Sequence, residues 1–218
     1  MSRSKVSQRA FTIAEVLSVL FILGLVLSFV ALIVGPLLRS QSETQAKVDT
    51  IQAAAMALYR VERDLRNTTI TYVYACTTGP TPSCNIAPTT LTATSAIVMS
   101  SAYQPGNGQF QFSTSTGKPT WQGAAVYWID GGGNLNYAFD QPTSSGWTVG
   151  NTLTGPQAQQ AVTDVMANGG MQLARFVQQM SVAVPNNGHQ VSFQMQAQST
   201  VGSASNETTY RTDLETRN

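Results

Sequence analysis

The chain has 218 residues, of which 12 are Lys or Arg and 11 are Asp or Glu, so its formal net charge is +1 and only 11% of its residues are charged. This balance argues against strong electrostatic binding of nucleic acid. The sequence contains a single histidine, no plausible nucleophile–base pair and no phosphate-binding loop. These features argue against an enzyme, and they indicate neither a cofactor nor a metal site.

Residues 9–38, RAFTIAEVLSVLFILGLVLSFVALIVGPLL, form an apolar segment with one carboxylate, Glu15, near its start. No charged residue lies between Val16 and Leu38, and about twenty apolar residues are enough to cross a bilayer. A carboxylate is expensive to bury in such a segment, so it marks a functional contact. The residues before Phe11 include three bases and no acid, which favours a cytoplasmic location for this end of the chain.

Two other interpretations compete for this segment. A secretory signal peptide would have a shorter apolar region and a small-residue cleavage site after it, whereas the residues that follow here are RSQSE, residues 39–43. A plain membrane anchor explains the hydrophobicity but gives no reason for Glu15 to stand five residues after a basic leader.

The string AFTIAEVL, residues 10–17, resembles the class III prepilin signal of type IV pilins and type II secretion pseudopilins. In these families a short basic leader is cut immediately before a Phe, and the new amino terminus is methylated. The resemblance therefore implies a leader at residues 1–10, cleavage between Ala10 and Phe11, and methylation of Phe11 by a prepilin peptidase/methyltransferase. Ala10 stands where the family usually has Gly, and Ala is the next smallest residue.

Glu15 becomes the fifth residue of the mature chain if this cleavage occurs. The resemblance implies that its carboxylate pairs with the terminal amine of an adjacent subunit during extraction from the membrane, and pairing offsets part of the cost of two charges in a low dielectric. Loss of the leader would leave nine of the 12 basic residues against 11 acidic ones, a net charge of about −2. This charge does not favour nucleic acid as a partner.

The helix that is predicted to begin at Phe11 continues to about Arg66, and these bounds, 11–66, define a transmembrane and assembly helix. We expect Gly35 and Pro36 to bend it, because Pro removes a backbone hydrogen bond and clashes with the preceding turn. Its second half carries an apolar stripe at three- and four-residue spacing. The stripe consists of Val48, Ile51, Ala55, Leu58, Val61 and Leu65.

Charged residues flank this stripe near the end of the helix. Two pairs are expected at a spacing of four residues, Arg60 with Asp64 and Glu62 with Arg66. A phosphate-binding face is the alternative interpretation of the arginines, but the acids between them favour a solvated helix flank.

Residues 67–218 are predicted to form a β-rich globular head. Strand patterns occupy residues 69–75, 89–99, 109–113, 124–129, 135–139, 176–184, 191–197 and 208–216. A short helix is expected at residues 156–167, between a Pro and a Gly pair. The fold class is therefore α+β, with a long amino-terminal helix whose first half spans a membrane and whose second half packs on an antiparallel β-sheet head.

Cys76 and Cys84 bracket the turn-forming sequence TTGPTPS. A disulfide between them would stabilise the head by roughly 2–3 kcal/mol, and it would fit an oxidising compartment beyond the membrane. A metal site is disfavoured, because two thiols and the distant His189, read as an exposed loop residue, do not make four ligands. The sequence DGGGN, residues 130–134, is predicted to be a hairpin turn rather than a calcium or phosphate cradle.

Four segments of the head also carry a family resemblance: ALYRVERDLRN from residue 57, AVYWIDGGGNLNYAF from residue 125, LARFVQQMSVAV from residue 173 and TTYRTDLETRN from residue 208. They are similar to J-type minor pseudopilins and PilW-like minor pilins, and the resemblance implies a pilin-like fold. It also implies a minor type IV pilin that helps to initiate or cap a pilus with roles in DNA uptake, adhesion or twitching motility, or alternatively a minor pseudopilin of a type II secretion system.

The implied partners are other pilins or pseudopilins in a filament, the inner-membrane assembly platform and the membrane itself. The implied location is a single pass through the inner membrane with the head in the periplasm, followed by a surface pilus or a periplasmic pseudopilus. A third hypothesis makes the head a filament-tip module that binds a ligand or DNA. Trp121, Trp128 and Trp147 would stack on ligands if they were exposed, although tryptophans in strands are more often buried.

Overall fold

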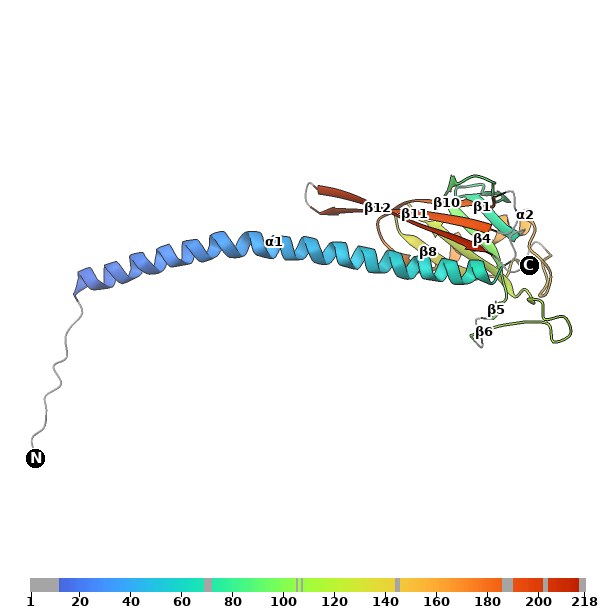
Figure 1. Ribbon diagram of the computed structural model, residues 1–218, viewed down its shortest axis with the longest axis horizontal. Coiled ribbons are helices and arrows are strands. Elements are labelled where there is room, and N and C mark those ends of the chain that lie inside the picture. The colour runs from blue at the N-terminus through green and yellow to red at the C-terminus, as the bar shows by residue number, and fades with distance from the viewer. Residues whose placement is uncertain are drawn as a thin grey trace, which may run out of the picture. The chain divides into compact units, whose positions relative to one another are not determined.

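The computed structural model describes residues 12–68, 72–104, 106, 108–143, 146–185, 190–201 and 204–215 (Figure 1). The chain separates into two compact units, residues 1–45 and 46–218. The first unit contains the amino-terminal part of the long helix α1 (Ile13–Arg66), and the second contains the rest of α1 and every strand described. We call the second unit, residues 46–218, the head.

Helix α1 continues without a break from Ile13 to Arg66, which confirms the long amino-terminal helix predicted from the sequence. Gly35 and Pro36 both lie inside it, and the bend expected there stays a prediction. Two basic residues, Arg63 and Arg66, occupy its last turn. Positive charge at this position stabilises the carboxyl end of a helix, where the backbone carbonyls carry partial negative charge.

The larger sheet of the head has six antiparallel strands in the order β2–β1–β4–β7–β8–β9. In that order their bounds are Ser83–Ile86, Val73–Thr77, Ala96–Ser101, Gly123–Ile129, Leu135–Asp140 and Met171–Ala174. The β7–β8 pair is the predicted hairpin. Its DGGGN segment turns because the Asp130 carboxylate accepts hydrogen bonds from the backbone N–H groups of Gly132 and Asn134, at 2.8 and 2.9 Å.

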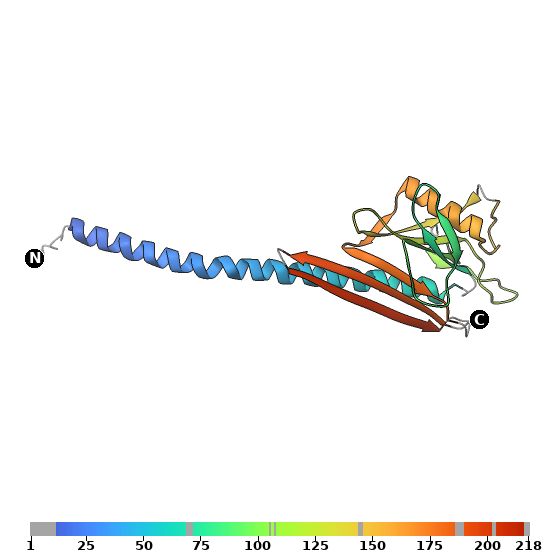
Figure 2. The same cartoon turned by 90° about the horizontal axis from the view of Figure 1, so that it is seen from above.

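A second antiparallel sheet has the order β12–β11–β10–β3. Its strands are Ala204–Glu215, Gln190–Val201, Val177–Ala183 and Thr92–Thr94, and Figure 2 shows β11 and β12 as a long hairpin. The short strands β5 (Tyr103–Gln104) and β6 (Gln109–Phe110) pair with each other. The remaining helix, α2 (Gly155–Asn168), lies where a short helix was predicted.

The prediction of a single strand at residues 89–99 is wrong, because the structure has two strands there. The structure divides it into β3 in the smaller sheet and β4 in the larger one, with Ser95 between them. The hydroxyl of Thr94 donates to the carbonyls of Cys76 and Ala96, at 2.7 and 2.8 Å. These bonds hold the chain at the point where it passes from one sheet to the other.

Two apolar cores lie on opposite faces of the six-stranded sheet. The first is formed by that sheet, the smaller sheet and the end of α1, and its largest fully buried members include Tyr127, Phe193 and Leu65. The second lies under α2 and includes Trp121 and Leu153. Strand β4 is buried at all six positions because both of its faces are covered, as expected for a strand in the middle layer of a domain.

The apolar stripe predicted on the second half of α1 is only partly correct. Val61 and Leu65 are fully buried, but Val48, Ile51 and Ala55 are exposed. The residues that are buried instead are Ala54 and Ala57. The buried face of α1 is thus rotated toward small side chains.

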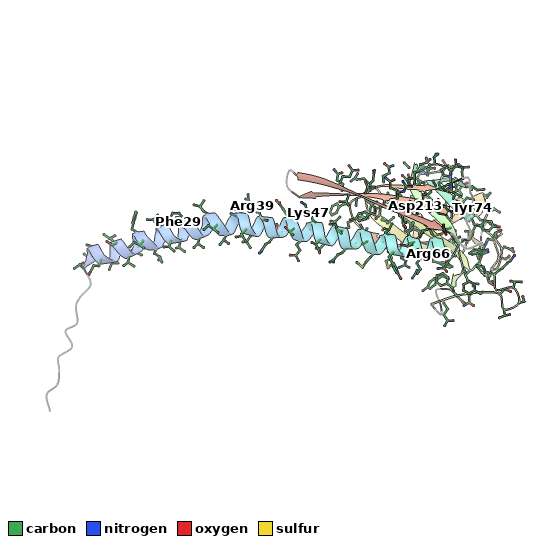
Figure 3. All side chains as sticks on the ribbon, viewed as in Figure 1. Phe29, Arg39, Lys47, Arg66, Tyr74 and Asp213 are labelled. Atoms are coloured by element: carbon green, nitrogen blue, oxygen red, sulfur yellow. A yellow bond between two sulfur atoms is a disulfide. The ribbon has the colours of Figure 1, made fainter. Side chains whose placement is uncertain are left out.

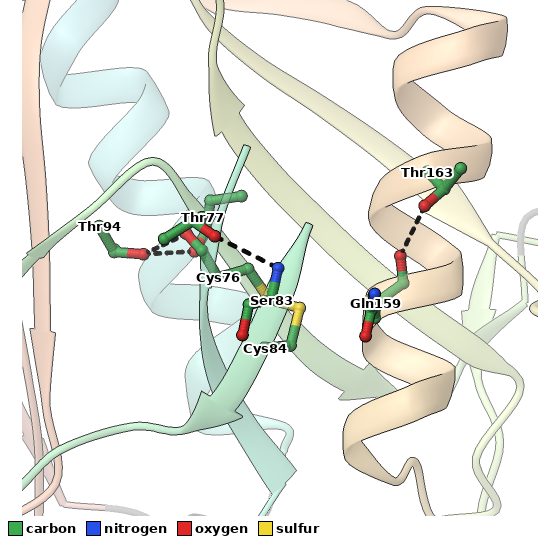
Figure 4. Close-up of a disulfide and its surroundings, with 8 residues drawn as sticks. Cys76, Thr77, Ser83, Cys84, Thr94, Gln159 and Thr163 are labelled. Atoms are coloured by element: carbon green, nitrogen blue, oxygen red, sulfur yellow. Dashed lines mark hydrogen bonds between the residues drawn. A yellow bond between two sulfur atoms is a disulfide. The ribbon is translucent and has the colours of Figure 1, made fainter. Parts of the chain in front are cut away.

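The predicted Cys76–Cys84 disulfide is confirmed. The two cysteines are direct partners in the β1–β2 register. In addition, the backbone N–H of Ser83 donates to the hydroxyl of Thr77 at 3.2 Å, beside the bond (Figure 4). The disulfide therefore joins the edge strand β2 to its neighbour at the start of the six-stranded sheet.

Candidate assembly helix and its amino-terminal cap

The apolar part of α1 is exposed along its whole length in the isolated chain. Its large hydrophobic side chains from Ile13 to Leu38 all lie on the surface, and Figure 3 draws them along the helix, with Phe29 inside the apolar run and Arg39 just after it. By length and composition, α1 is the one helix among the described residues that is able to cross a membrane. So large an exposed apolar surface is typical of a segment that contacts a bilayer or other protein.

Polar side chains inside the apolar run are satisfied within the helix itself. The hydroxyl of Ser18 donates to the carbonyl of Ala14 at 2.8 Å, and that of Ser28 donates to the carbonyl of Gly24 at 2.9 Å. A bilayer core offers no water to unpaired polar groups, so spanning segments must satisfy such groups internally. The two serines therefore do not oppose burial of the segment in lipid or in a filament.

Glu15 forms a cap at the beginning of α1. Its Oε2 accepts hydrogen bonds from the backbone N–H of Thr12 at 2.9 Å and from the Thr12 hydroxyl at 3.1 Å. In return, the backbone N–H of Glu15 lies 3.4 Å from the Thr12 hydroxyl oxygen. This reciprocal arrangement is a capping box, which satisfies N–H groups that the first turn of a helix leaves without a partner.

Thr12 is therefore a residue of this site that the sequence reasoning missed. The signal was present, because a Thr followed three residues later by a Glu just before an apolar run is the sequence pattern of a capping box. The sequence analysis predicts only that the Glu15 carboxylate pairs with the terminal amine of a neighbouring subunit. The structure adds that the carboxylate already has two donors within its own chain.

Ala10 and Phe11, the predicted cleavage and methylation positions, lie outside the described residues, and so does His189. Glu15, Gly35 and Pro36 are all within α1, whereas Cys76 and Cys84 are in the head. Two groups of predicted site residues thus belong to different units of the chain.

A buried carboxylate near the end of α1 holds the helix against the six-stranded sheet. Asp64 is 4% exposed, and its Oδ2 accepts a hydrogen bond of 2.6 Å from the Tyr127 hydroxyl. Its Oδ1 accepts bonds from the guanidinium of Arg63, at 3.0 and 3.1 Å. The pKa of Tyr127 is well above its usual value because the phenol is buried and faces the Asp64 carboxylate, so the hydroxyl remains a donor.

This arrangement corrects one predicted ion pair. Arg60 was expected to pair with Asp64, but its guanidinium lies over the ring of Tyr137, with the central carbon 3.8 Å from the ring centroid. Asp64 pairs instead with Arg63 and is buried rather than solvated. The other predicted pair, Glu62 with Arg66, is present at 2.6 Å.

The described part of the head offers no group of three or more metal-binding side chains. Its three tryptophans are buried, at 4% to 6% exposure, so their rings do not form an open stacking surface. No family model, no curated protein and no solved structure matches this chain. The fold and the site thus define an α+β protein with a long, exposed and capped apolar helix attached to a disulfide-bonded β head.

Proposed function

We propose that the chain is a minor type IV pilin, a structural subunit that polymerises through α1 and helps to initiate or cap a pilus. The observation that carries the proposal is the exposed apolar run of α1 with a single carboxylate, Glu15, at its capped amino end. The resemblance of residues 10–17 to a prepilin signal supports it. The subunit would be held in the inner membrane with its head in the periplasm before it enters a filament.

The capping geometry suggests how Glu15 serves both states. In the single subunit, the two donors of Thr12 offset part of the cost of placing a carboxylate at the edge of a bilayer. A carboxylate has about four acceptor positions, so an incoming amine from a neighbouring subunit adds a partner without removing the cap. The charge of that amine is then compensated in the filament, which favours docking over a return to the membrane.

Three variants separate charge pairing from capping. We predict that Glu15→Val leaves the protein in the membrane and out of filaments sheared from cells. Glu15→Gln keeps an oxygen that can accept from Thr12, because Gln serves in capping boxes as Glu does, but it loses the charge. Glu43→Val is the matched control, since Glu43 is an exposed carboxylate of the same helix beyond the apolar run.

The expected result is that Glu15→Val and Glu15→Gln are both absent from the sheared fraction, whereas Glu43→Val is recovered at the wild-type level. Normal recovery of Glu15→Gln would show that the cap, and not the charge, is what assembly requires. Deletion of the gene distinguishes the alternative assignment: lost export of secreted proteins with normal piliation would indicate a type II secretion pseudopilin.

A further inference from the structure

A cleft of about 610 Å³ opens in the head at the carboxyl end of α1. Its described lining comes from the end of that helix, from the 112–119 segment and from residues that adjoin the second core. We call it the α1-end cleft. The side chains on which the argument below depends are Arg66, Thr68, Tyr72, Phe112, Lys118 and Trp121.

Three aromatic rings line the α1-end cleft, of which Tyr72 and Phe112 are accessible and Trp121 is buried. Tyr72 and Trp121 meet edge to face, with their ring centroids 6.2 Å apart. Phe112 is 52% exposed and belongs to a bridge with Pro119. The segment between them is held by a backbone bond of 2.8 Å from the Ser113 N–H to the Lys118 carbonyl, so the ring of Phe112 is presented on an ordered loop.

The charged side chains of the described lining are all basic. Arg66 shares its guanidinium with Glu62, yet it remains 59% exposed. Lys118 is exposed, and within the described part of the chain its ammonium group has no ion-pair partner within 4.0 Å. Because the Glu62 carboxylate already pairs with Arg66, the described lining has one uncompensated positive charge, that of Lys118, and is complementary to a ligand that carries one negative charge.

A buried hydroxyl adds a third feature. Thr68 lines the cleft and is 2% exposed, and its Oγ1 has no hydrogen-bond partner among the described residues. A buried hydroxyl without a partner is costly, and such groups in folded proteins call for an explanation. A hydroxyl group of a ligand would satisfy it.

We propose that the α1-end cleft binds an acidic sugar, a pyranose ring that carries a carboxylate. One face of such a ring consists of C–H groups and packs on aromatic side chains, its rim offers hydroxyls to Thr68, and its carboxylate meets Lys118 and Arg66. The volume is that of a small-molecule site, with apolar walls and a few polar groups. Single-stranded nucleic acid fits less well, because a phosphate chain requires a continuous basic groove and the described lining offers only two cations.

The binding test uses the full-length chain in detergent micelles, with fluorescence of the buried tryptophans and calorimetry as readouts. The probe is an oligomer of galacturonic acid, and neutral maltohexaose and oligothymidylate are the comparison ligands. We expect saturable binding of the acidic oligosaccharide alone. Binding of maltohexaose with equal affinity would overturn the role of the cations, and binding of oligothymidylate in place of the sugar would assign the cleft to nucleic acid.

Two variants and a control locate the site. Lys118→Gln should weaken binding about tenfold or more, because a charge-assisted contact with a carboxylate is among the stronger hydrogen bonds. Phe112→Ala should weaken binding of the acidic sugar to a similar extent. Arg175→Gln, which changes an exposed base outside the cleft, should leave binding unchanged.

Equal binding by wild type and Lys118→Gln would refute the cleft as the site. An unchanged unfolding midpoint, followed by tryptophan fluorescence, shows that each variant is folded. The inference rests on the proposed function only for its setting on a filament surface. Filaments that assemble normally from a chain that binds no sugar would refute the cleft proposal alone, whereas sugar binding by a chain that never enters filaments would refute the pilin proposal alone.

Discussion

The hydrogen bond between Tyr127 and Asp64 provides the sharpest quantitative test of how the carboxyl-terminal part of α1 is held within the head. Tyr127→Phe removes the donor of a bond of 2.6 Å to a carboxylate that is 4% exposed. Hydrogen bonds to charged groups contribute about 1.5–3 kcal/mol. Arg63 still holds the other carboxylate oxygen, so the carboxylate is not left wholly unpaired, and we expect a loss of about 2 kcal/mol in the free energy of unfolding.

Tryptophan fluorescence in a urea titration is a suitable assay, because all three tryptophans of the chain lie in the head and are buried. The unfolding of the head is therefore monitored, in the full-length protein in detergent micelles, without a signal from the apolar run of α1. Tyr59→Phe is the matched control: Tyr59 is on the same helix but 70% exposed, and surface changes of this kind fall within about 0.5 kcal/mol.

The pH dependence gives a second check. Burial, together with the Asp64 charge, raises the pKa of Tyr127 well above its usual value, so the phenol remains protonated between about pH 6 and 9. The destabilisation by Tyr127→Phe should therefore be constant over that range. A loss below about 0.5 kcal/mol, no larger than that of Tyr59→Phe, would refute the view that this buried pair anchors the helix.

Three further changes test the head. Asp140→Asn should stabilise the head by on the order of 1 kcal/mol at pH 7.5, after allowance for solvent screening, and this gain should vanish near pH 4. Burial and a second carboxylate on α2 raise the pKa of Asp140 to about 6 in the folded state, so ionisation above that pH opposes folding. An equal gain at both pH values would contradict this. Replacing Cys76 and Cys84 with Ser should lower the unfolding free energy by about 2–3 kcal/mol. In about 10 mM reductant, the unfolding free energy of the wild type should approach that of the double variant. Gly170→Ala should destabilise the head by about 1–3 kcal/mol, since the added Cβ would lie 2.6 Å from a backbone oxygen of β8. Gly131→Ala, whose Cβ would have open space around it, should be nearly neutral in the same urea titration.

Much of the architecture follows from local sequence patterns. The apolar run, the hairpin at residues 124–139 and the short helix after Pro156 each appear close to their predicted positions. Periodicity identifies such elements because it records which face of a segment avoids water. The disulfide was predictable for a similar local reason, since a turn-forming loop lies between the two cysteines.

The partners of individual side chains were decided only by tertiary packing. Asp64 has the spacing of a solvated ion pair with Arg60, yet in the folded head it is buried against Tyr127, sixty-three positions away in sequence. No helix periodicity encodes that contact, because it depends on where β7 passes beneath α1. Likewise, the division of residues 89–99 between two sheets follows from pairing with strands that are distant in the chain.

The sequence by itself determined that the chain has a helix with a membrane-length apolar run, a carboxylate at its start and a β head that contains a disulfide. These properties depend on composition and on spacings of a few residues, which act locally. The tertiary structure alone decided which face of α1 is buried, that the tryptophans are enclosed, and that two bases, three aromatic rings and a hydroxyl without a partner among the described residues line one cleft. These depend on long-range packing, in which each contact is fixed by the simultaneous burial of all the others.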